Sequence, residues 1–544
     1  MIEDTQKRES GRKVQLSNIV AARSVCDIVA TCLGPKAMLK MLMDPMGGIV
    51  ITNDGNAILR EITVQHPASK SIIEIARTQE EEVGDGTTSV VILAGELMAA
   101  AEPFIEQNLH PLHIIKGFKL ALDDAVNFLK SKLAITINPK NKNEVLSVIK
   151  SCLGTKISSQ WSELTCSLAW EAVSMVTIDS AGKKEADIKR YIRVEKIAGA
   201  CIEDSCILRG IVLNKDVLHP SMPRCIKNPR ILLLDCGLEY KKGESMTNIE
   251  VLKEEDFDRL LKLEEEAIKK MCIDIIKHKP NLVITEKGCS DLAMYFLSKA
   301  GIAVLRRTKK TDNNRIARAT GAIIVNRTED IKEDDIGKGC GLFEVKKIGD
   351  EYYSYLVDCK NPKACSIILR GANKDILNEI DRNLHDAMSV ARNIILDPSV
   401  VPGGGATEIA IATYLENKSK SIDNLHQYPY KAAAKALEII PKILIKNCGH
   451  NPIRVLTELR SKHSSNETNS HFYGINGRTG AVANMKELGI LDSSLVRLQV
   501  LKVAFEVTIL LLKIDDVVSG TKKQVDPDAN VAPSSKGPAI PHTA

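Results

Sequence analysis

The 544-residue sequence lacks the short motifs that identify several common classes of protein. Its fourteen cysteines form no Cys-x-x-Cys pair, which argues against a zinc ribbon and against a thioredoxin-type redox site. The Walker phosphate loop, in which four residues separate a glycine from Gly-Lys-Ser or Gly-Lys-Thr, is also absent. The chain is therefore not an ordinary P-loop enzyme.

Long apolar runs and a strong charge of one sign are missing as well. No stretch of about 18 uninterrupted apolar residues occurs, and the apolar run 509–512 is far too short to span a bilayer. The N-terminus lacks a basic stretch followed by an apolar one and does not resemble a signal peptide. The net charge of +5 is small for this length and gives little reason to expect nucleic acid as a partner. We expect a cytoplasmic protein with reduced thiols that binds neither membrane nor nucleic acid.

The composition indicates large cores, because 44% of the residues are apolar and 26% are charged. At roughly 150 residues per domain, two or three domains are expected. The first and last thirds share a helical pattern, with a long helix predicted from about 88 to 101. Between them, the short apolar runs 231–234, 282–284 and 302–305 alternate with helical stretches, as in an α/β layer of parallel strands. We predict one domain built from both ends of the chain, with the middle inserted.

Three further segments have a specific expected structure. Residues 47–52 and 57–59 are predicted as short strands joined by a hairpin turn at 53–56, since Asn-Asp-Gly-Asn is a strong turn signal. The Glu- and Lys-rich segment 241–271 is predicted to be a charged helical excursion, which is either a solvated face or a projecting element. The tail 521–544 has too little apolar content to fold and is expected to be disordered.

The segment from Gly84 to Ser89 (Gly-Asp-Gly-Thr-Thr-Ser) is the most informative for function, because it directly precedes an apolar helix. Glycines let backbone N–H groups approach an anion, and a helix N-terminus adds partial positive charge. A carboxylate in such a loop repels phosphate unless a cation lies between them, so Asp85 is most simply a Mg²⁺ ligand. The alternative is a tight turn in which Thr87 or Thr88 merely caps the helix.

Other parts of a phosphate site are scattered along the chain. Gly34 is a second glycine break beside a helix, Asp54 is a carboxylate at a turn, and the glycines at 403–405 follow a helix that carries Asp386. Transfer of a phosphoryl group to water needs metal-neutralised phosphates and a carboxylate that acts on the water. Each part also has a purely structural interpretation, and spacing alone does not show that they converge.

Two of these segments resemble signatures of the group II chaperonins, namely residues 79–87 and residues 31–40. Further matches at 53–55, 402–406 and 514–516 follow in the family's order, and the similarity covers nearly the whole chain up to about residue 520. Within the family, one subunit type of the eukaryotic cytosolic complex fits best. The stretches that resemble it are 7–15, 44–48 and 238–245.

The resemblance implies the chaperonin fold, which is multidomain, α and α/β. A helical equatorial ATP-binding domain would consist of 1–140 and 406–520, and a small intermediate hinge domain of 141–212 and 371–405. An α/β apical substrate-binding domain would span 213–370, and its helical protrusion near 241–271 would serve as a lid segment.

The resemblance also implies a role for single residues in an ATP and Mg²⁺ site. Asp85 would hold Mg²⁺, while Asp54 and Asp386 match the carboxylates that act on the attacking water, with Asp386 as the principal base. Thr155 and Lys156 match the loop that senses the terminal phosphate. The other implied contacts are Gly34, Gly86, Thr87, Thr88 and Ser89 at the phosphates, Gly404, Asp492 and Arg497 near the ribose, and Gly477 and Arg478 near the adenine.

The implied function is that of an ATPase subunit in a hetero-oligomeric double ring of paralogous subunits. Hydrolysis would be coupled to closure of the lid over non-native proteins such as actin and tubulin. The alternative is a nucleotide-binding scaffold subunit with little or no hydrolysis, which would need neither Asp54 nor Asp386. A small-molecule kinase would need an acceptor pocket, for which the sequence has no motif.

Some positions depart from the family's pattern, chiefly on the adenine side. Arg497 stands where lysine is common, residues 483–485 lack the usual Asp before Met, and the stretch 464–472 is longer than usual. Cys359 and Cys365 also resemble a pair in the matching subunit type, which makes them a candidate disulfide. Two buried thiols are the alternative in a reducing compartment.

Overall fold

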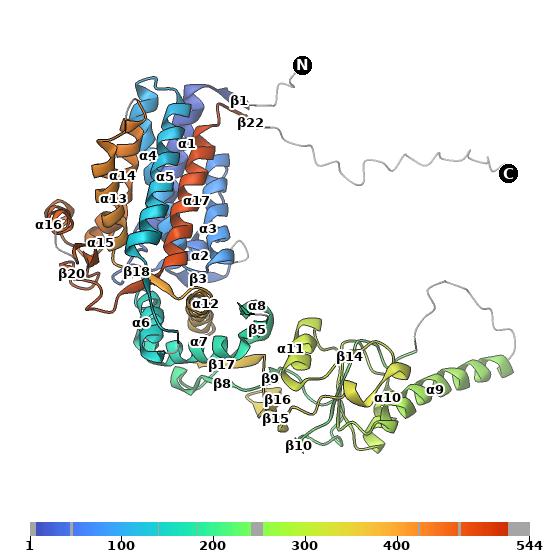
Figure 1. Ribbon diagram of the computed structural model, residues 1–544. Coiled ribbons are helices and arrows are strands. Elements are labelled where there is room, and N and C mark those ends of the chain that lie inside the picture. Colours follow the sequence, from blue (N-terminus) through green and yellow to red (C-terminus); the bar gives the residue numbers. More distant parts are fainter. Residues whose placement is uncertain are drawn as a thin grey trace, which may run out of the picture.

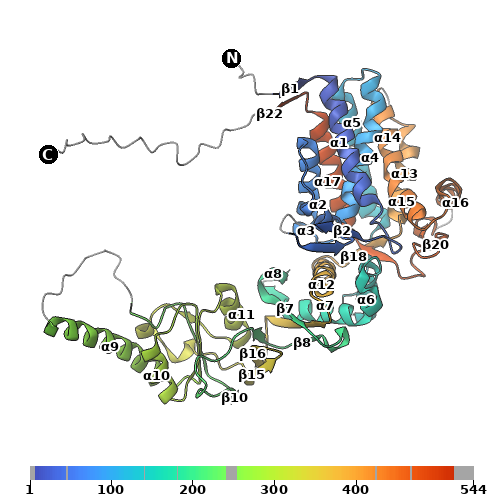
Figure 2. The ribbon, with the colours of Figure 1, turned by 180° about the vertical axis from the view of Figure 1, so that it is seen from behind.

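The computed structural model describes residues 7–43, 47–139, 141–180, 182–240, 254–422, 425–465 and 469–519. Its elements form three bodies, each around an apolar core of its own (Figure 1). We call them the terminal body, which is built from both ends of the chain, the linking body and the distal body. The linking body lies between the other two when the molecule is seen from either side (Figure 2).

Helices from both ends of the chain form the terminal body. At its centre α4 (Thr87–Glu106) packs against α1 (Arg12–Ala30) and α17 (Ser494–Leu512). The remaining elements are α2 (Gly55–Glu61), α3 (Pro67–Glu82), α5 (Pro111–Phe128), α13 (Ala406–Ser419), α14 (Gln427–Leu437), α15 (Ile439–Asn447), α16 (Pro452–Ser464), and the strand pairs β1 (Lys7–Ser10) with β22 (Asp516–Ser519) and β19 (Tyr473–Ile475) with β20 (Val482–Asn484).

Helix α4 is the predicted helix that follows the Gly-Asp-Gly loop, and it is longer than the sequence indicated. Among the described residues it is also the one helix long and apolar enough to cross a bilayer, and 61% of the window that meets this criterion is buried inside the protein. A helix that is apolar all round is expected at the centre of a large core. Its central position therefore accounts for its composition.

The structure corrects the hairpin that the sequence predicted at 47–59. The strand β3 (Ile49–Thr52) exists, but it pairs with the preceding strand β2 (Lys40–Met43), and residues 57–59 lie in α2. Asp54 caps α2, because its carboxylate accepts a hydrogen bond of 3.0 Å from the N–H of Ala57. The prediction was wrong because an Asn-Asp-Gly sequence suits a helix N-terminus as well as a turn.

Segments on either side of the distal body form the linking body. The long helix α12 (Lys374–Leu396) packs its apolar face against α6 (Lys142–Leu153) and α7 (Ser162–Val176). A three-stranded sheet flanks them, with β17 (Cys365–Gly371) between β7 (Ile192–Ala198) and β8 (Cys206–Leu208). The smaller elements are the 3-10 turn Ile157–Trp161, the strands β5 (Ile178–Ser180) and β6 (Lys183–Glu185), and the short helix α8 (Ile188–Tyr191).

The distal body contains the predicted layer of parallel strands. Their order is β13 (Ala303–Leu305), β12 (Leu282–Thr285), β11 (Ile231–Leu234) and β14 (Ile324–Val325), and all pairings in this sheet are parallel. Every residue of β11 and β12 is buried, as expected for strands covered on both faces. An antiparallel sheet of β10 (Cys225–Lys227), β15 (Leu342–Ile348), β16 (Glu351–Val357) and β9 (Ile211–Leu213) lies beside it, and the helices are α9 (Glu254–Lys277), α10 (Asp291–Lys299) and α11 (Lys310–Thr320).

Only part of the predicted lid segment can be compared with the structure. Helix α9 covers the second half of 241–271 and extends away from the sheets of the distal body (Figure 1). Residues 241–253 and the tail 521–544 lie outside the described residues, so those two predictions stay as they were made.

A small sheet fixes the point where the chain returns from the linking body to the terminal body. Its central strand β18 (Ser399–Pro402) pairs with β21 (Leu491–Ser493) on one side and with β4 (Ile135–Thr136) on the other. The register puts Val401 opposite Asp492. The end of α12, the glycines at 403–405 and the start of α17 are therefore held close to one another.

The crossing of α1 and α4 depends on Gly95. A Cβ atom added at this position would lie 2.0 Å from the sulfur of Cys26. We therefore expect Gly95→Ala to lower the free energy of unfolding by about 1–3 kcal/mol, the usual cost of overpacking a core. Urea unfolding of the purified chain measures this change.

The same change in a Cys26→Ala background is the control for this prediction. With the sulfur removed, Gly95→Ala should cost less than it does in the parent chain, since contacting residues are not additive. An equal cost in both backgrounds would show that the sulfur does not limit the crossing.

Candidate functional site

A cavity lies where the terminal body meets the linking body, and we call it the junction cavity. It has two adjoining parts that share Gly34, Ser89, Thr155, Asp492 and Arg497, and the larger part encloses about 530 Å³. This size is within the usual range of small-molecule sites. All the residues expected to bind the nucleotide line it, namely Gly34, Asp85, Gly86, Thr87, Thr88, Ser89, Thr155, Lys156, Gly404, Gly477, Arg478, Asp492 and Arg497.

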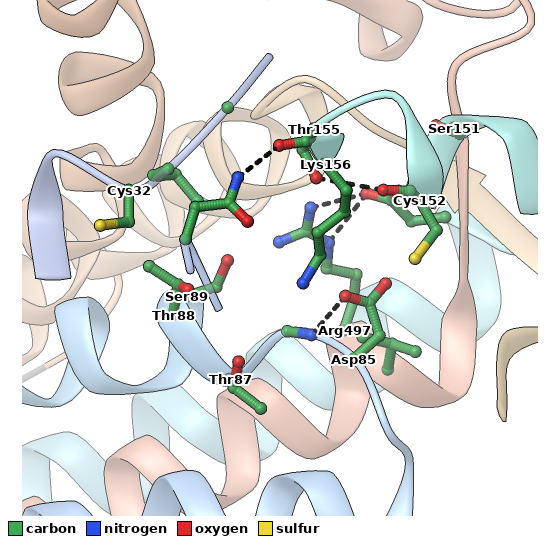
Figure 3. Close-up of a pocket in the computed structure, with 16 residues that line it drawn as sticks. Cys32, Asp85, Thr87, Thr88, Ser89, Ser151, Cys152, Thr155, Lys156 and Arg497 are labelled. Carbon is green, nitrogen blue, oxygen red and sulfur yellow. Dashed lines mark hydrogen bonds and ion pairs between the residues drawn. The ribbon is translucent and has the colours of Figure 1, made fainter. Parts of the chain in front are cut away.

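The N-terminus of α4 forms the side of this cavity that is suited to bind phosphate. Gly84 and Gly86 have φ angles of 75° and 78°, a left-handed conformation that favours glycine, and they turn the chain into the helix. The first turn of a helix leaves its N–H groups without intrahelical partners and carries partial positive charge. Figure 3 shows the side chains of Thr87, Thr88 and Ser89 gathered at this turn. The arrangement suits an anion.

The carboxylate of Asp85 lies in the same loop. Its Oδ1 accepts a hydrogen bond of 2.7 Å from the N–H of Gly86, and the side-chain amide of Gln79 donates to its carbonyl oxygen at 2.9 Å. Burial raises the pKa of Asp85, and the nearby ammonium of Lys156 lowers it. The described residues contain no group of three or more His, Cys, Asp or Glu that could hold a metal. A cation at Asp85 would therefore need further ligands, which fits the preference of Mg²⁺ for few carboxylates together with phosphate oxygens and water.

Lys156 joins the two carboxylates that the sequence singled out. Its ammonium lies 2.8 Å from Oδ2 of Asp386 and 3.8 Å from Oδ1 of Asp54, and the three side chains are only 10–12% exposed. The hydroxyl of Thr87 donates to Oδ1 of Asp54 at 3.2 Å. We call Lys156, Asp54 and Asp386 the ion cluster, which brings together residues from the terminal body and from both chain segments of the linking body.

The ion cluster changes the proton affinities of its members. Burial raises the pKa of Asp386, and the ammonium of Lys156 opposes this effect. Burial by itself would lower the pKa of Lys156, but Asp386 and Asp54 outweigh it and hold that pKa well above its usual value. Lys156 is therefore charged at neutral pH, while Asp386 is a stronger base than an exposed aspartate. A stronger base is better suited to accept a proton from water.

Asp54 and Asp386 do not line the described junction cavity itself. They line a second cavity of about 580 Å³, which lies between α2 and α3 of the terminal body and α8 and α12 of the linking body. We call it the rear cavity. Because Lys156 lines the junction cavity and contacts both carboxylates, the ion cluster stands between the two cavities.

A buried network lies on the ribose side of the predicted site. Arg497 donates to Oδ2 of Asp492 at 2.6 Å and to Oε1 of Glu408 at 2.9 Å. Glu408 is 4% exposed and was missed by the sequence analysis. The signal was available, since a lone glutamate in the apolar segment 406–412 is expected to be buried only with a charged partner. Arg497, which stands where lysine is common in the family, thus positions Asp492 in this chain.

Two glycines close the remaining wall of the junction cavity. A Cβ atom at Gly404 would lie 2.6 Å from the sulfur of Met485, and one at Gly477 would lie 2.5 Å from the ring of Pro35. Neither position could hold a larger residue without movement. The break at Gly34-Pro35 and the distant Gly477 therefore belong to one wall, and Arg478 is exposed at its edge. The described part of the long stretch 464–472 stays outside this wall.

The candidate disulfide is not formed in the structure, in which all fourteen cysteines are free. The thiol of Cys365 points toward the carbonyl oxygen of Ala172 at 3.8 Å, within the core of the linking body. Cys359 belongs to the core of the distal body, where its thiol forms a hydrogen bond with the thiol of Cys340. In the structure, Cys359 and Cys365 are therefore two buried thiols, which was the alternative to a disulfide.

Comparisons with known proteins agree with this geometry. The sequence model of the TCP-1/cpn60 chaperonin family matches residues 25–522. T-complex protein 1 subunit gamma of Rattus norvegicus is 58% identical over 526 residues, which cover 97% of this chain and 96% of that protein. The same subunit of Drosophila melanogaster is 58% identical over 525 residues, or 96% and 95% of the two chains. The resemblance to the chaperonins and to one of their subunit types is confirmed.

Removing the cation of the ion cluster should make stability depend on pH. Lys156→Met leaves the buried carboxylate of Asp386 without its cation, so the pKa of Asp386, which burial already raises, moves further above the ordinary ~3.9. The folded state then binds more protons than the unfolded state, so stability is lost as the pH rises from that value through the raised one. We expect the free energy of unfolding to fall by about 3–5 kcal/mol at pH 8, and by clearly less at pH 5.

Urea unfolding at the two pH values measures this difference. Lys142→Met is the matched control, because the Lys142 ammonium lies 3.8 Å from Glu171 in a pair that is about half exposed, and such pairs contribute little. A loss for Lys156→Met that is the same at both pH values would contradict the assignment.

Proposed function

The chain belongs to the TCP-1/cpn60 chaperonin family, and from this premise we propose that it is an ATP-hydrolysing subunit of a hetero-oligomeric chaperonin that encloses non-native proteins. The observation that carries the proposal is the ion cluster. Asp54 from the terminal body and Asp386 from the linking body meet at Lys156, at the edge of a cavity whose other side is a helix N-terminus. Activation of water beside a bound phosphate needs this combination.

ATP would occupy the junction cavity with its phosphates at the start of α4. The N–H groups and hydroxyls of Thr87, Thr88 and Ser89 would donate to phosphate oxygens. Asp85 would hold Mg²⁺, which supplies positive charge that offsets the phosphates when it is bound. Asp492, held by Arg497, would accept from ribose hydroxyls, and the wall at Gly404 and Gly477 would contact the ribose and the base.

Asp386 would take the proton of the attacking water, with Asp54 orienting that water. Asp386 lies on α12 of the linking body, whereas the Gly84-Asp85-Gly86 turn, where the phosphates would bind, belongs to the terminal body. The base reaches the phosphate only while the two bodies are together, so hydrolysis would be coupled to closure of the linking body and, through the distal body, to closure of the lid.

The distal body would bind the non-native protein. Its helices α9 and α10 carry exposed apolar side chains, among them Leu263 at 57%, Ile273 at 54% and Tyr295 at 59%. Apolar side chains gathered on a surface are typical of protein-binding sites. Clients such as actin and tubulin, in the cytoplasm, are part of this proposal.

The hairpin of β2 and β3 supports assembly with neighbouring paralogous subunits. Met41 is 71% exposed and Met43 is 78% exposed, and Ile49, which pairs with Met43, is 53% exposed. An apolar strand pair that projects its side chains into water is a liability unless another chain covers it. We assign this hairpin to the contact with the next subunit of the ring.

The catalytic assignment is tested with Asp386→Asn in the assembled particle. We expect the rate of hydrolysis in this subunit's own site to fall by about 10²–10⁴-fold, the usual contribution of a general base, while ATP still binds. Electron microscopy of particles frozen at intervals after addition of ATP reads the fraction of ADP in each site. Asp375→Asn, on the exposed first turn of the same helix, is the control. ADP that forms at the parental rate in the Asp386→Asn site would refute the assignment. A parental site that never forms ADP would favour the scaffold instead.

The assembly surface is tested with the double substitution Met41→Lys and Met43→Lys. Burying two charges at the centre of an interface should weaken association by about 2 kcal/mol or more, which is the scale of an interface hot spot. We expect the chain to be lost from the ring-sized fraction on size-exclusion chromatography. Ile323→Lys, at a position 55% exposed in the distal body, should assemble normally. Normal assembly of the double variant would contradict this role of the hairpin.

A further inference from the structure

The rear cavity gives the ion cluster a second side that faces away from the nucleotide. Asp54 and Asp386 line it, and so do Asn56 and Glu80 from the terminal body and Lys189 and His385 from the linking body. The cavity is large and polar enough to hold water. A proton that reaches Asp386 from the nucleotide side can therefore leave it into the polar rear cavity.

Glu80 is the first further carboxylate on that route. It lies on α3, lines the rear cavity together with Asp54, and accepts a hydrogen bond from the side-chain amide of Asn56. Burial and the charge of Asp54 raise the pKa of Glu80, against the effect of the Asn56 amide. Asn56 is two residues from Asp54, so the amide links the helix cap at the ion cluster to this second carboxylate.

The other charged groups around Glu80 are less suited to carry a proton. On its own helix, Glu74 and Glu81 are exposed and lie within 4.0 Å of Arg77. From α12, Asp381 is paired with Lys196, and Arg382 is paired with Glu379. Arg60 on α2 and Lys189 on α8 are cations. His385 has a lowered pKa because of burial and of the neighbouring Lys189.

We propose that the rear cavity is the outlet for the proton of the attacking water, and that Glu80 relays this proton from Asp386 to solvent. This inference rests on the proposed ATP hydrolysis and adds a group to its chemistry. Neither Lys156 nor the nucleotide side offers an alternative, since Lys156 is already protonated and ATP fills the junction cavity during the reaction.

The water oxygen forms a bond to the γ-phosphorus, the bond from that phosphorus to the bridging oxygen breaks with its electron pair on ADP, and the water proton passes to the carboxylate of Asp386. Water in the rear cavity then takes this proton to the carboxylate of Glu80, which releases it to solvent. Asp386 returns to its charged form, and the net products are ADP, inorganic phosphate and one proton.

Glu80→Gln tests the relay, because glutamine keeps an acceptor for the Asn56 amide but does not carry a proton. The experiment uses assembled particles in which the sister subunits carry Asp→Asn at the position that matches Asp386, so that this site alone turns over. We expect kcat to fall by about 10–100-fold, at the lower end of acid–base effects, with KM unchanged. Formate, a small carboxylate that can enter the cavity, should restore much of the rate, and Glu80→Asp should retain most of it.

The matched control is Asp375→Asn, at the exposed first turn of α12, which should leave kcat unchanged. A parental kcat for Glu80→Gln would overturn the relay. So would a slow variant that formate does not restore and whose KM rises, since that pattern indicates a structural role. If particles with the parental chain do not hydrolyse ATP at this site, the proposed function fails before the relay is tested.

Discussion

The buried contact of Lys156 with Asp386 and Asp54 is the interaction on which the site depends. Two carboxylates with little exposure to water are stable in the charged form only beside a cation, and Lys156 is the cation that contacts both. The same ammonium lines the cavity proposed for the triphosphate. A bound phosphate would compete with the carboxylates for this charge, and the balance between them then depends on whether nucleotide is present. Ligand binding and the position of the linking body would in this way be tied to a single side chain.

Helix α12 is held against the residues that precede α4 by more than this ion pair. The side chain of Arg392 donates to the carbonyl oxygen of Glu82 at 2.6 Å, and that of Asn393 donates to the carbonyl oxygen of Val83 at 2.9 Å. Ser389 lies so close to Gly84 that a Cβ there would collide with it. Helix α12 therefore contacts the residues that lead directly into the Gly-Asp-Gly turn. A displacement of α12 would therefore move Asp386, the proposed base, and disturb the Gly-Asp-Gly turn at the same time.

The elements that the sequence predicted are those with a strong local signal. The buried strand Ile231–Leu234 and helix α4 follow from apolar runs and from the glycine loop. Asp54 was predicted to lie in a hairpin turn, because its local sequence fits both a turn and a helix N-terminus. Only the pairing of β3 with the preceding strand β2 decides between these two structures. The meeting of Asp54, Lys156 and Asp386 could be expected from the family resemblance but not from spacing, since it depends on how distant segments pack. Glu80 was missed for the same reason, whereas Glu408 could have been recognised as a lone glutamate in an apolar segment.

The distal body is connected to the site through a very short helix. Arg315 on α11 donates to the carbonyl oxygens of Arg190 and Lys189 at 2.7 and 3.1 Å, and α8 has only four residues. The buried Asp312, also on α11, pairs with Arg193 at the start of β7. Since Lys189 lines the rear cavity beside Asp386, α8 is held by the distal body at its backbone and faces the carboxylates with its side chain. A rotation of the distal body has to move α8, because its backbone carbonyls are bonded from that side. The charge environment of Glu80 and His385, on both of which Lys189 acts, thus depends on the distal body, although no residue of that body lines either of the two cavities described.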